Sequence, residues 1–277
     1  MGGGLPSGPG AVMDGGMSER PYEQAGGGFV NPAKVRLAAG EAIGAFMVAV
    51  PSVAAVQILA RSGIDALILD MEHGAIDLAT LQAMIAATQG TRAAPLVRVP
   101  ATEPWLVKPV LDAGAMGVNF PLIGSAKEAR SAAAAVRYPP IGVRGYAPSF
   151  AATRWGVSEA EYWRIADREI LNIITIETPA AIAALDDILG VPGIDVAAIA
   201  SFDLSMSLGR PGAFDDPEMR RLVAEAETKI KRAGIVMAGV ALSAEVAAAK
   251  RAAGYRMLLK GFDVAMLGKA AHDAAGF

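Results

Sequence analysis

The sequence contains no cysteine and only two histidines among its 277 residues. Without cysteine, it can form no disulfide framework, thiolate metal site, iron–sulfur cluster or cysteine nucleophile. Its 25 basic and 28 acidic side chains leave a formal net charge of -3. This balance gives no basic field for nucleic acid and no polybasic patch for an anionic membrane. We therefore expect neither nucleic acid nor a membrane among its partners.

Aromatic residues are also scarce, at 6%, yet the mean hydropathy is +0.38 because the chain is rich in alanine. The longest uncharged stretch, residues 42–60, is about as long as a membrane span. Pro51 and Ser52 interrupt it, which favours a buried strand, Ala45–Val50, followed by a helix, Val53–Ser62, capped by Ser52. We expect no membrane span. The start of the sequence does not resemble a signal peptide, so we expect a cytoplasmic protein.

Residues 1–28 differ in composition from everything that follows. They hold ten of the 31 glycines and show almost no apolar periodicity. A segment of this kind cannot bury enough apolar surface to offset the entropy of ordering. We expect a disordered, glycine-rich N-terminal tail over residues 1–28, followed by a single domain over residues 29–277.

Eight short apolar segments alternate with longer amphipathic segments after the tail. The apolar segments are Ala45–Val50, Ala66–Asp70, Leu96–Val99, Gly117–Leu122, Asn172–Glu177, Val196–Ala200, Met237–Leu242 and Met257–Gly261. Such continuously apolar strands are typical of parallel sheets covered on both faces. A doubly wound sheet would have fewer strands and a glycine-rich first turn. The pattern therefore predicts an α/β fold, a (β/α)8 TIM barrel.

In a barrel of this type, the active site lies at the carboxyl ends of the strands. Polar residues follow several predicted strands and should share this face: Asp70, His73, Arg98, Glu177 and Asp203. By contrast, Asp65 and Asp195 precede strands, so we expect them on the opposite face, which serves stability.

Each of these polar residues also has an ordinary structural explanation. His73 could be a loop histidine, Arg98 part of a buried salt bridge, and Glu177 and Asp203 acids in first turns of helices. Taken together, the two carboxylates suit a hard cation such as Mg2+ or Mn2+. Arg98 would bind a carboxylate or steady an enolate oxygen. Asp70 would orient the imidazole of His73 as a proton carrier, so the set favours enolate formation from an α-keto acid.

Several segments carry a resemblance to a known family. They read DMEHGAID, PLVRVP, GVNFPLI, RYPPIGVRGY, IETPAAI, PGIDVAAIASFDLSMSLG and LLKGFDVAML. In order and spacing, they resemble the HpcH/HpaI aldolase family from about Ala42 to the C-terminus. This family includes 4-hydroxy-2-oxoheptanedioate aldolase and 2-dehydro-3-deoxyglucarate aldolase. The resemblance implies a class II pyruvate-dependent aldolase, which is a carbon–carbon lyase.

The resemblance also implies roles for individual residues. Glu177 and Asp203 would bind a divalent metal ion, Mg2+ or Mn2+, with Co2+ as a further option. The enzyme would reversibly cleave a 4-hydroxy-2-oxo acid to pyruvate and an aldehyde through a pyruvate enolate held on the metal. Arg98 would stabilise the enolate, and His73 with Asp70 would act as acid and base. The peptide N–H groups of Ser201, Phe202 and Asp203 would hold the pyruvate carboxylate.

Other implications concern assembly and specificity. Asp112 matches an acid that family members lend to the histidine of a neighbouring subunit. The family exchanges its last helix between protomers and forms hexamers, so we expect a homo-oligomer. This chain has Thr175 where glutamine is common, and Phe202 lies in a segment that often reads Gly-Pro-x-Asp. We expect the region of Tyr146 and Trp155 to shape the aldehyde pocket.

Three other functions remain open on the sequence alone. The same metal enolate could serve an oxaloacetate-type decarboxylase. A class I aldolase could use Lys260, on the last predicted strand, as a Schiff-base lysine. The chain could also be a non-catalytic assembly subunit, although the intact set of His73, Arg98, Glu177 and Asp203 argues against this.

Overall fold

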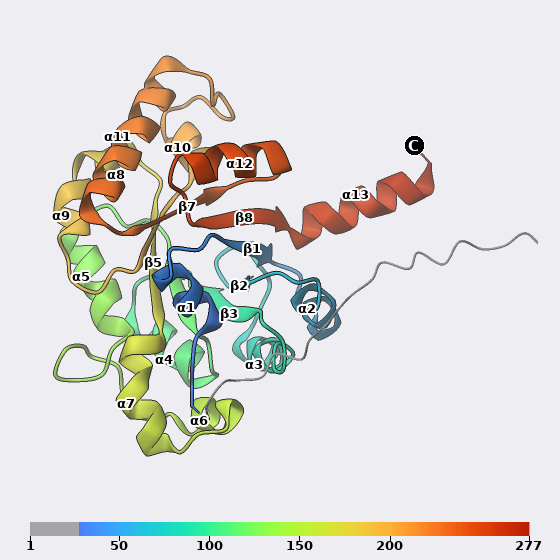
Figure 1. The fold of residues 1–277 in the computed structure, drawn as a ribbon, viewed down its shortest axis with the longest axis vertical. Helices are drawn as coiled ribbons and strands as arrows, with labels where there is room; N and C mark the ends of the chain where they lie inside the picture. The colour runs from blue at the N-terminus through green and yellow to red at the C-terminus, as the bar shows by residue number, and fades with distance from the viewer. Residues whose placement is uncertain (1–27, 277) are drawn as a thin grey trace, which may run out of the picture.

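The computed structural model describes residues 28–276. Eight parallel strands close into a barrel in sequence order, and β8 pairs with β1 (Figure 1). The predicted (β/α)8 fold is confirmed. The tail predicted for residues 1–28 lies outside the described residues apart from Gly28.

Each of the eight predicted strands overlaps an observed strand. The strands are β1 (Ile43–Val48), β2 (Ala66–Asp70), β3 (Ala94–Arg98), β4 (Gly117–Phe120), β5 (Leu171–Ile176), β6 (Val196–Ile199), β7 (Val236–Val240) and β8 (Met257–Phe262). Five of them, β2 to β6, are buried almost throughout, because side chains fill the barrel on one face and helices cover the other.

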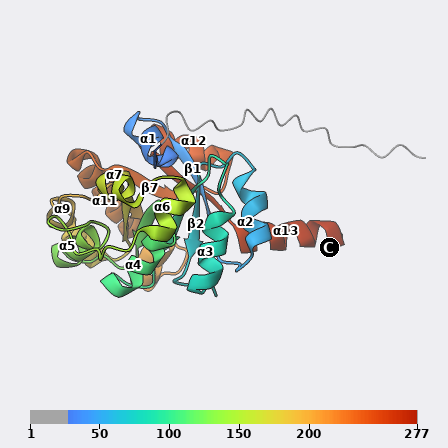
Figure 2. The same cartoon turned by 90° about the horizontal axis from the view of Figure 1, so that it is seen from below.

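Helices connect the strands and surround the barrel (Figure 2). They are α1 (Pro32–Ala38), α2 (Val53–Ala60), α3 (Leu78–Ala86), α4 (Pro104–Asp112), α5 (Ala126–Ala135), α6 (Ser149–Trp155), α7 (Glu159–Glu169), α8 (Pro179–Ala183), α9 (Leu185–Leu189), α10 (Ser201–Ser207), α11 (Pro217–Ala233), α12 (Ala244–Ala252) and α13 (Asp263–Ala275). Many begin at a side chain that accepts a hydrogen bond from a backbone N–H of the first turn, as Ser52 does from Ala55. Two short helices, α8 and α9, meet at Ala184.

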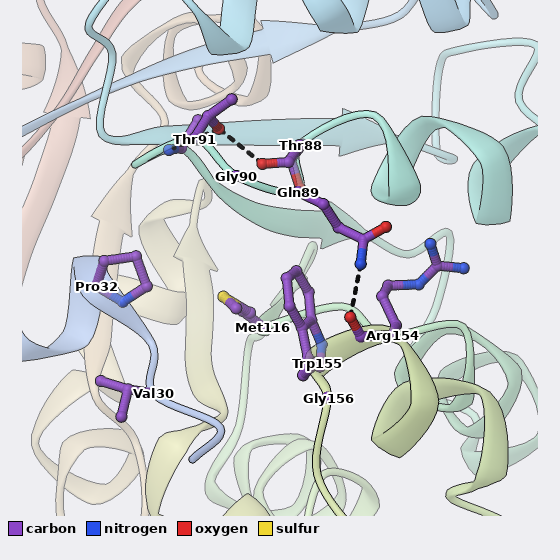
Figure 3. A pocket seen from close by; sticks show the side chains of 11 residues that line it. Val30, Pro32, Thr88, Gln89, Gly90, Thr91, Met116, Arg154, Trp155 and Gly156 are labelled. Carbon is purple, nitrogen blue, oxygen red and sulfur yellow. Dashed lines mark hydrogen bonds between the residues drawn. The ribbon is translucent and has the colours of Figure 1, made fainter. Parts of the chain in front are cut away.

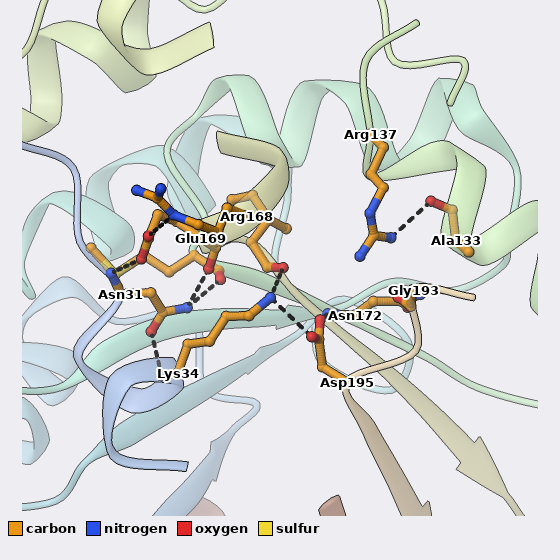
Figure 4. Close-up of polar contacts among 11 residues, drawn as sticks. Asn31, Lys34, Ala133, Arg137, Arg168, Glu169, Asn172, Gly193 and Asp195 are labelled. Carbon is orange, nitrogen blue, oxygen red and sulfur yellow. Dashed lines mark hydrogen bonds and ion pairs between the residues drawn. The ribbon is translucent and has the colours of Figure 1, made fainter. Parts of the chain in front are cut away.

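The face of the barrel at the amino ends of the strands is held by polar contacts. Asp195 accepts a hydrogen bond from the backbone N–H of Asn172 at 2.8 Å and pairs with Lys34 Nζ at 2.9 Å (Figure 4). Asp65 accepts a hydrogen bond from the backbone N–H of Gly44 at 2.8 Å. Both aspartates therefore lie on the face that the sequence predicted for them, and Asp195 joins α1 to β5.

The last helix does not return to its own barrel. Both views show α13 projecting away from the strands (Figures 1 and 2). Asp263 is its one buried residue among those described, while Val264 and Leu267 are 57% and 66% exposed. Within residues 28–276, no helix is both long and apolar enough to cross a membrane.

Candidate active site

Arg98 and Asp70 form the centre of the candidate site. They end β3 and β2, and they are direct partners in the register of these strands. Arg98 donates from Nε to Asp70 Oδ1 at 2.8 Å and from Nη2 to Oδ2 at 2.7 Å, which is a two-pronged pair. Burial lowers the pKa of Arg98, but its carboxylate partners outweigh burial and raise the pKa above its ordinary value. The arginine is therefore fixed as a cation at the rim.

The strand register places other polar residues in the same layer of the barrel. Asn119 pairs with Arg98 in the register of β3 and β4, so the two side chains share a face. Thr175, on β5, donates from Oγ1 to Asn119 Oδ1 at 2.9 Å, and both residues are buried. Asn119 therefore supplies the acceptor for the Thr175 hydroxyl.

The turn after β2 carries the histidine. Asp70 Oδ1 accepts hydrogen bonds from the backbone N–H groups of Glu72, at 3.0 Å, and His73, at 3.3 Å. Gly74 closes the turn, and a β-carbon there would lie 2.2 Å from the Asp70 carbonyl oxygen. Burial alone would raise the pKa of Asp70, but Arg98 and these N–H donors hold the pKa below its ordinary value. Asp70 is therefore ionised, and its carboxylate holds the backbone of this turn.

The predicted dyad of Asp70 and His73 is not formed by side chains in this structure. Both oxygens of Asp70 are occupied by Arg98, because the strand register brings the guanidinium beside the carboxylate. The imidazole of His73 is 69% exposed, and its Nε2 lies 3.7 Å from Glu72 Oε2. Asp70 thus positions the backbone of His73, and the carboxylate nearest the imidazole belongs to Glu72.

Glu72 is a member of the site that sequence reasoning did not single out. Its Oε2 lies 3.1 Å from Arg98 Nε, yet this buried atom accepts no hydrogen bond within the described part of the chain. Burial raises the pKa of Glu72, opposed by the charge of Arg98. The sequence did contain a signal, because Glu72 lies between Asp70 and His73 in the motif after β2.

Glu177 and Asp203 follow β5 and β6, which are neighbouring strands of the barrel. Glu177 directly follows β5, and its carboxylate accepts a hydrogen bond from the backbone N–H of Leu122. Burial raises the pKa of Glu177, and the charges of Asp203 and Glu72 raise it further. Asp203 lies in the first turn of α10, just after β6. Glu177 and Asp203 therefore share the end of the barrel at which Arg98 ends β3.

The donor set fits a divalent cation. The charges of Asp203 and Glu72 act on Glu177, and those of Asp70 and Asp203 act on Glu72, while Arg98 is the guanidinium that opposes them, so the site has an excess of negative charge. The unpartnered oxygen of Glu72 adds to this excess. No group of three or more metal-binding side chains occurs within residues 28–276. Two carboxylates are nevertheless sufficient for a cation such as Mg2+, which retains waters and binds substrate oxygens.

The residues predicted to bind a carboxylate lie at the start of α10. Ser201, Phe202 and Asp203 form its first turn, where backbone N–H groups have no acceptor within the helix. The ring of Phe202 is about half exposed and packs edge-on against Phe214, with 4.8 Å between ring centroids. An aromatic pair therefore stands beside Asp203 on the rim.

Two other predicted residues, Asp112 and Trp155, lie away from the rim. Asp112 ends α4, near the amino ends of the strands, and pairs with Arg144 at 3.0 Å. Trp155 is buried, and its Nε1 donates to the carbonyl of Gly114, which precedes β4. The expectation that Trp155 shapes the aldehyde pocket is therefore wrong for its own barrel. Chain direction explains the error, because this tryptophan ends a helix that has returned to the opposite face.

The side chain of Lys260 begins beside β1. Lys260 is the extra residue at a register shift between β8 and β1. A β-carbon on Gly44 would lie 3.4 Å from Lys260 Cγ and 3.9 Å from Asp65 Oδ2, so the lysine stem lies beside the amino end of β1. This position gives no support to a Schiff-base role in the site of Arg98 and Glu177.

A cavity of about 460 Å3 opens on the face opposite the rim (Figure 3). Its lining comes from segments that precede strands, among them Thr88, Thr91 and Met116. Gln89 crosses its edge and donates to the carbonyl of Arg154 at 2.6 Å. The cavity is therefore separate from the polar rim, and the candidate active site is the group of charged residues at the carboxyl ends of the strands.

Comparisons with known proteins agree with this geometry. A family model described as HpcH/HpaI aldolase/citrate lyase matches residues 45–270. A hydroxypyruvate/pyruvate aldolase of Roseovarius nubinhibens is 36% identical, covering 79% of this chain and 85% of the relative. A 2-keto-3-deoxy-L-rhamnonate aldolase of Shigella sonnei is 35% identical over 85% and 88% of the two chains. The crystal structure of an HpcH/HpaI aldolase from Desulfitobacterium hafniense superposes with a TM-score of 0.82 at 29% identity, covering 87% of this chain and 94% of that one.

Proposed function

This chain belongs to the HpcH/HpaI aldolase/citrate lyase family and is an aldolase, and on that premise we propose that it reversibly cleaves a 4-hydroxy-2-oxo acid to pyruvate and an aldehyde. The relatives named as pyruvate aldolases support pyruvate as the retained product. The observation that carries the proposal is Arg98, locked by Asp70 beside Glu72, Glu177 and Asp203.

We assign metal binding to Glu177 and Asp203. A bound Mg2+ or Mn2+ would act as a Lewis acid on the substrate carbonyl. Burial and the neighbouring negative charges raise the pKa of Glu177, so a bound cation would favour its ionised form. The backbone N–H groups of Ser201, Phe202 and Asp203 would hold the substrate carboxylate at the start of α10.

Arg98 and His73 supply the remaining steps. In the cleavage direction, His73 accepts the proton of the 4-hydroxyl group, the bond between C3 and C4 breaks, and the aldehyde leaves. Arg98 stabilises the negative charge that develops on the enolate oxygen of pyruvate. A proton returned to C3 completes pyruvate. The exposed imidazole of His73 beside Glu72 suits this exchange, because it can reach both substrate and solvent.

We further propose that the active enzyme is a homo-oligomer, a hexamer by family resemblance. In it, Asp112 would reach the His73 of a neighbouring subunit. The position of Asp112, at the end of α4 away from its own rim, suits action across an interface. The projecting helix α13 supports assembly, because a 13-residue helix without tertiary packing is marginal in water.

The direct test is release of pyruvate from a panel of 4-hydroxy-2-oxo acids, with and without exhaustive metal removal. We expect pyruvate release that a chelator abolishes and that Mg2+ or Mn2+ restores. Activity that survives metal removal, or covalent trapping of pyruvate by borohydride at Lys260, would refute the metal assignment. Oxaloacetate in the same panel separates cleavage of hydroxy-oxo acids from decarboxylation.

A further inference from the structure

The loop of residues 137–148 buries an arginine that the active site does not use directly. Arg144 is 2% exposed and is the largest fully buried side chain within residues 28–276. Its backbone N–H donates to the carbonyl of Arg137 at 2.8 Å. Gly142 lets the loop close, because a β-carbon there would lie 2.2 Å from the same carbonyl oxygen. The loop is therefore folded so that Arg144 points into the protein.

Two tyrosines hold the guanidinium of Arg144 in place. Its central carbon lies 4.6 Å from the ring centroid of Tyr138 and 5.5 Å from that of Tyr162, which is on α7. Aromatic faces attract a cation at such distances. Nε and Nη1 of Arg144 have no hydrogen-bond partner in the described part of the chain. The rings therefore hold the guanidinium by packing, and Nη2 is the nitrogen that donates a hydrogen bond to a side chain.

The polar partner of Nη2 is Asp112. The distance from Arg144 Nη2 to Asp112 Oδ1 is 3.0 Å, and across residues 28–276 this carboxylate is the one acidic partner of Arg144. No donor from these residues reaches Asp112 Oδ2, and the side chain is 17% exposed. Oδ1 of Asp112 is thus held by Arg144, while Oδ2 has no donor within residues 28–276.

Asp112 needs this support. It is the last residue of α4, where the partial negative charge of the helix end disfavours a carboxylate. Burial raises its pKa, and the opposing influences are Arg144 and, more weakly, Lys108. The phenolic groups of Tyr138 and Tyr162 face the same pair and remain neutral at ordinary pH, because burial raises the pKa of each. Arg144 is therefore the main group that favours an ionised Asp112.

We propose that Arg144 is a positioning residue that fixes the Asp112 carboxylate for the active site of a second copy of this chain. This inference rests on the proposed function, in which Asp112 serves His73 of a neighbouring subunit. The loop of residues 137–148 would then act in the reaction through Arg144, because the buried guanidinium sets the direction of Oδ2 of Asp112.

The test is a double-mutant cycle on kcat for pyruvate release, with Arg144→Met and Asp112→Asn. Each single variant should lower kcat about tenfold or more, and the double variant should match Asp112→Asn, because residues that act as a unit are non-additive. KM for the substrate should change little, since Arg144 touches no substrate. Arg144→Lys, which keeps the charge, should recover part of the lost kcat.

The matched control is Lys108→Met, which removes an exposed positive charge that acts on Asp112 more weakly than Arg144 does and that forms no hydrogen bond or ion pair within residues 28–276. It should retain the kcat of the natural protein. Melting temperature and oligomeric mass identify a variant that fails to fold. If Arg144→Met does not fold, Arg144→Lys decides the question, and a kcat equal to that of the natural protein then overturns the inference.

The two proposals fail in different ways. If Asp112→Asn leaves kcat unchanged, the trans role in the proposed function is wrong. If Asp112→Asn lowers kcat and Arg144→Met lowers it again by the same factor in that background, the role of Asp112 stands and the inference about Arg144 is overturned.

Discussion

At the residue scale, the candidate site is defined by an imbalance of charge. Among the residues that the structure describes, Arg98 is the one cation that influences Asp70, Glu72 and Glu177 in common. It is committed to Asp70 by two hydrogen bonds, so it neutralises the other carboxylates only in part. Such a site favours binding of a further cation, and the geometry of Arg98 decides where charge is stabilised.

Replacing Arg98 with lysine should lower kcat/KM by roughly a hundredfold or more while the barrel persists. Lysine keeps the charge but cannot make two parallel hydrogen bonds to Asp70, so the cation would lose its fixed direction. Steady-state kinetics and a thermal melt measure the two effects. Arg92→Lys is the control, because Arg92 pairs with Asp65 on the opposite face. Equal losses in both variants would contradict the assignment.

Glu177→Gln should weaken binding of Mn2+ by at least about tenfold, because removing one of two carboxylate ligands leaves no replacement. In the unsubstituted protein, affinity should fall as the pH drops through a range above 4.5, the ordinary pKa of glutamate. The reason is that the raised pKa of Glu177 makes protons compete with the metal. Isothermal titration at several pH values measures both effects.

The control for this experiment is Glu41→Gln, on the opposite face, where Glu41 pairs with Arg36. Its Mn2+ affinity should equal that of the natural protein at every pH. An unchanged affinity in Glu177→Gln would show that the metal binds elsewhere.

At the element scale, the turn between β2 and α3 sets the positions of Glu72 and His73 relative to the end of β2. Asp70 ends the strand, its carboxylate accepts two backbone N–H groups of the turn, and Gly74 passes close to both Asp70 and Ala49. The turn therefore has little freedom. His73 obtains its position from this backbone, since within residues 28–276 the one carboxylate paired with its imidazole is that of Glu72, at 3.7 Å.

Gly74→Ala should lower kcat strongly and reduce the free energy of unfolding by about 1–3 kcal/mol, the range for overpacking a crowded site. The added β-carbon would lie 2.2 Å from a carbonyl oxygen, so the turn must shift. Kinetics and denaturant unfolding measure the outcome. Gly268→Ala, in α13, has open space around it and should be neutral or stabilising. Full activity in Gly74→Ala would refute the role of the turn.

At the scale of the whole molecule, the main feature is that α13 leaves the barrel. Asp263 anchors its start by accepting hydrogen bonds from the backbone N–H groups of Ala49 and Val50, at 3.0 and 2.9 Å. Ile58, on α2, is 73% exposed. The helix and the barrel surface each leave apolar side chains without cover, which a second copy of the chain could provide.

Truncation after Val264, which keeps Asp263 in place, should lower the oligomeric mass measured by light scattering. Leu267→Glu should have the same effect, because it places a charge on an apolar position of α13. Lys269→Glu is the control, since this residue lies on a different side of the helix and already carries a charge. An unchanged mass after truncation would mean that α13 does not join protomers.

The sequence by itself determined the barrel, the order of its strands and the face on which the polar residues gather. These properties follow from local patterns: continuous apolar segments, capping residues, and polar residues placed just after strands. The prediction for Asp65 and Asp195 held for the same reason, because chain direction decides which end of a strand a residue occupies.

Only the tertiary structure decided how the polar residues pair. Asp70 binds Arg98 rather than the imidazole of His73, because the register of β2 and β3 brings the guanidinium beside it. Glu72 enters the site through the same contact. The burial of Arg144 behind Asp112 joins segments that are 32 residues apart in sequence. Pairings of this kind depend on distances across strands and helices, which no local pattern in a single sequence encodes.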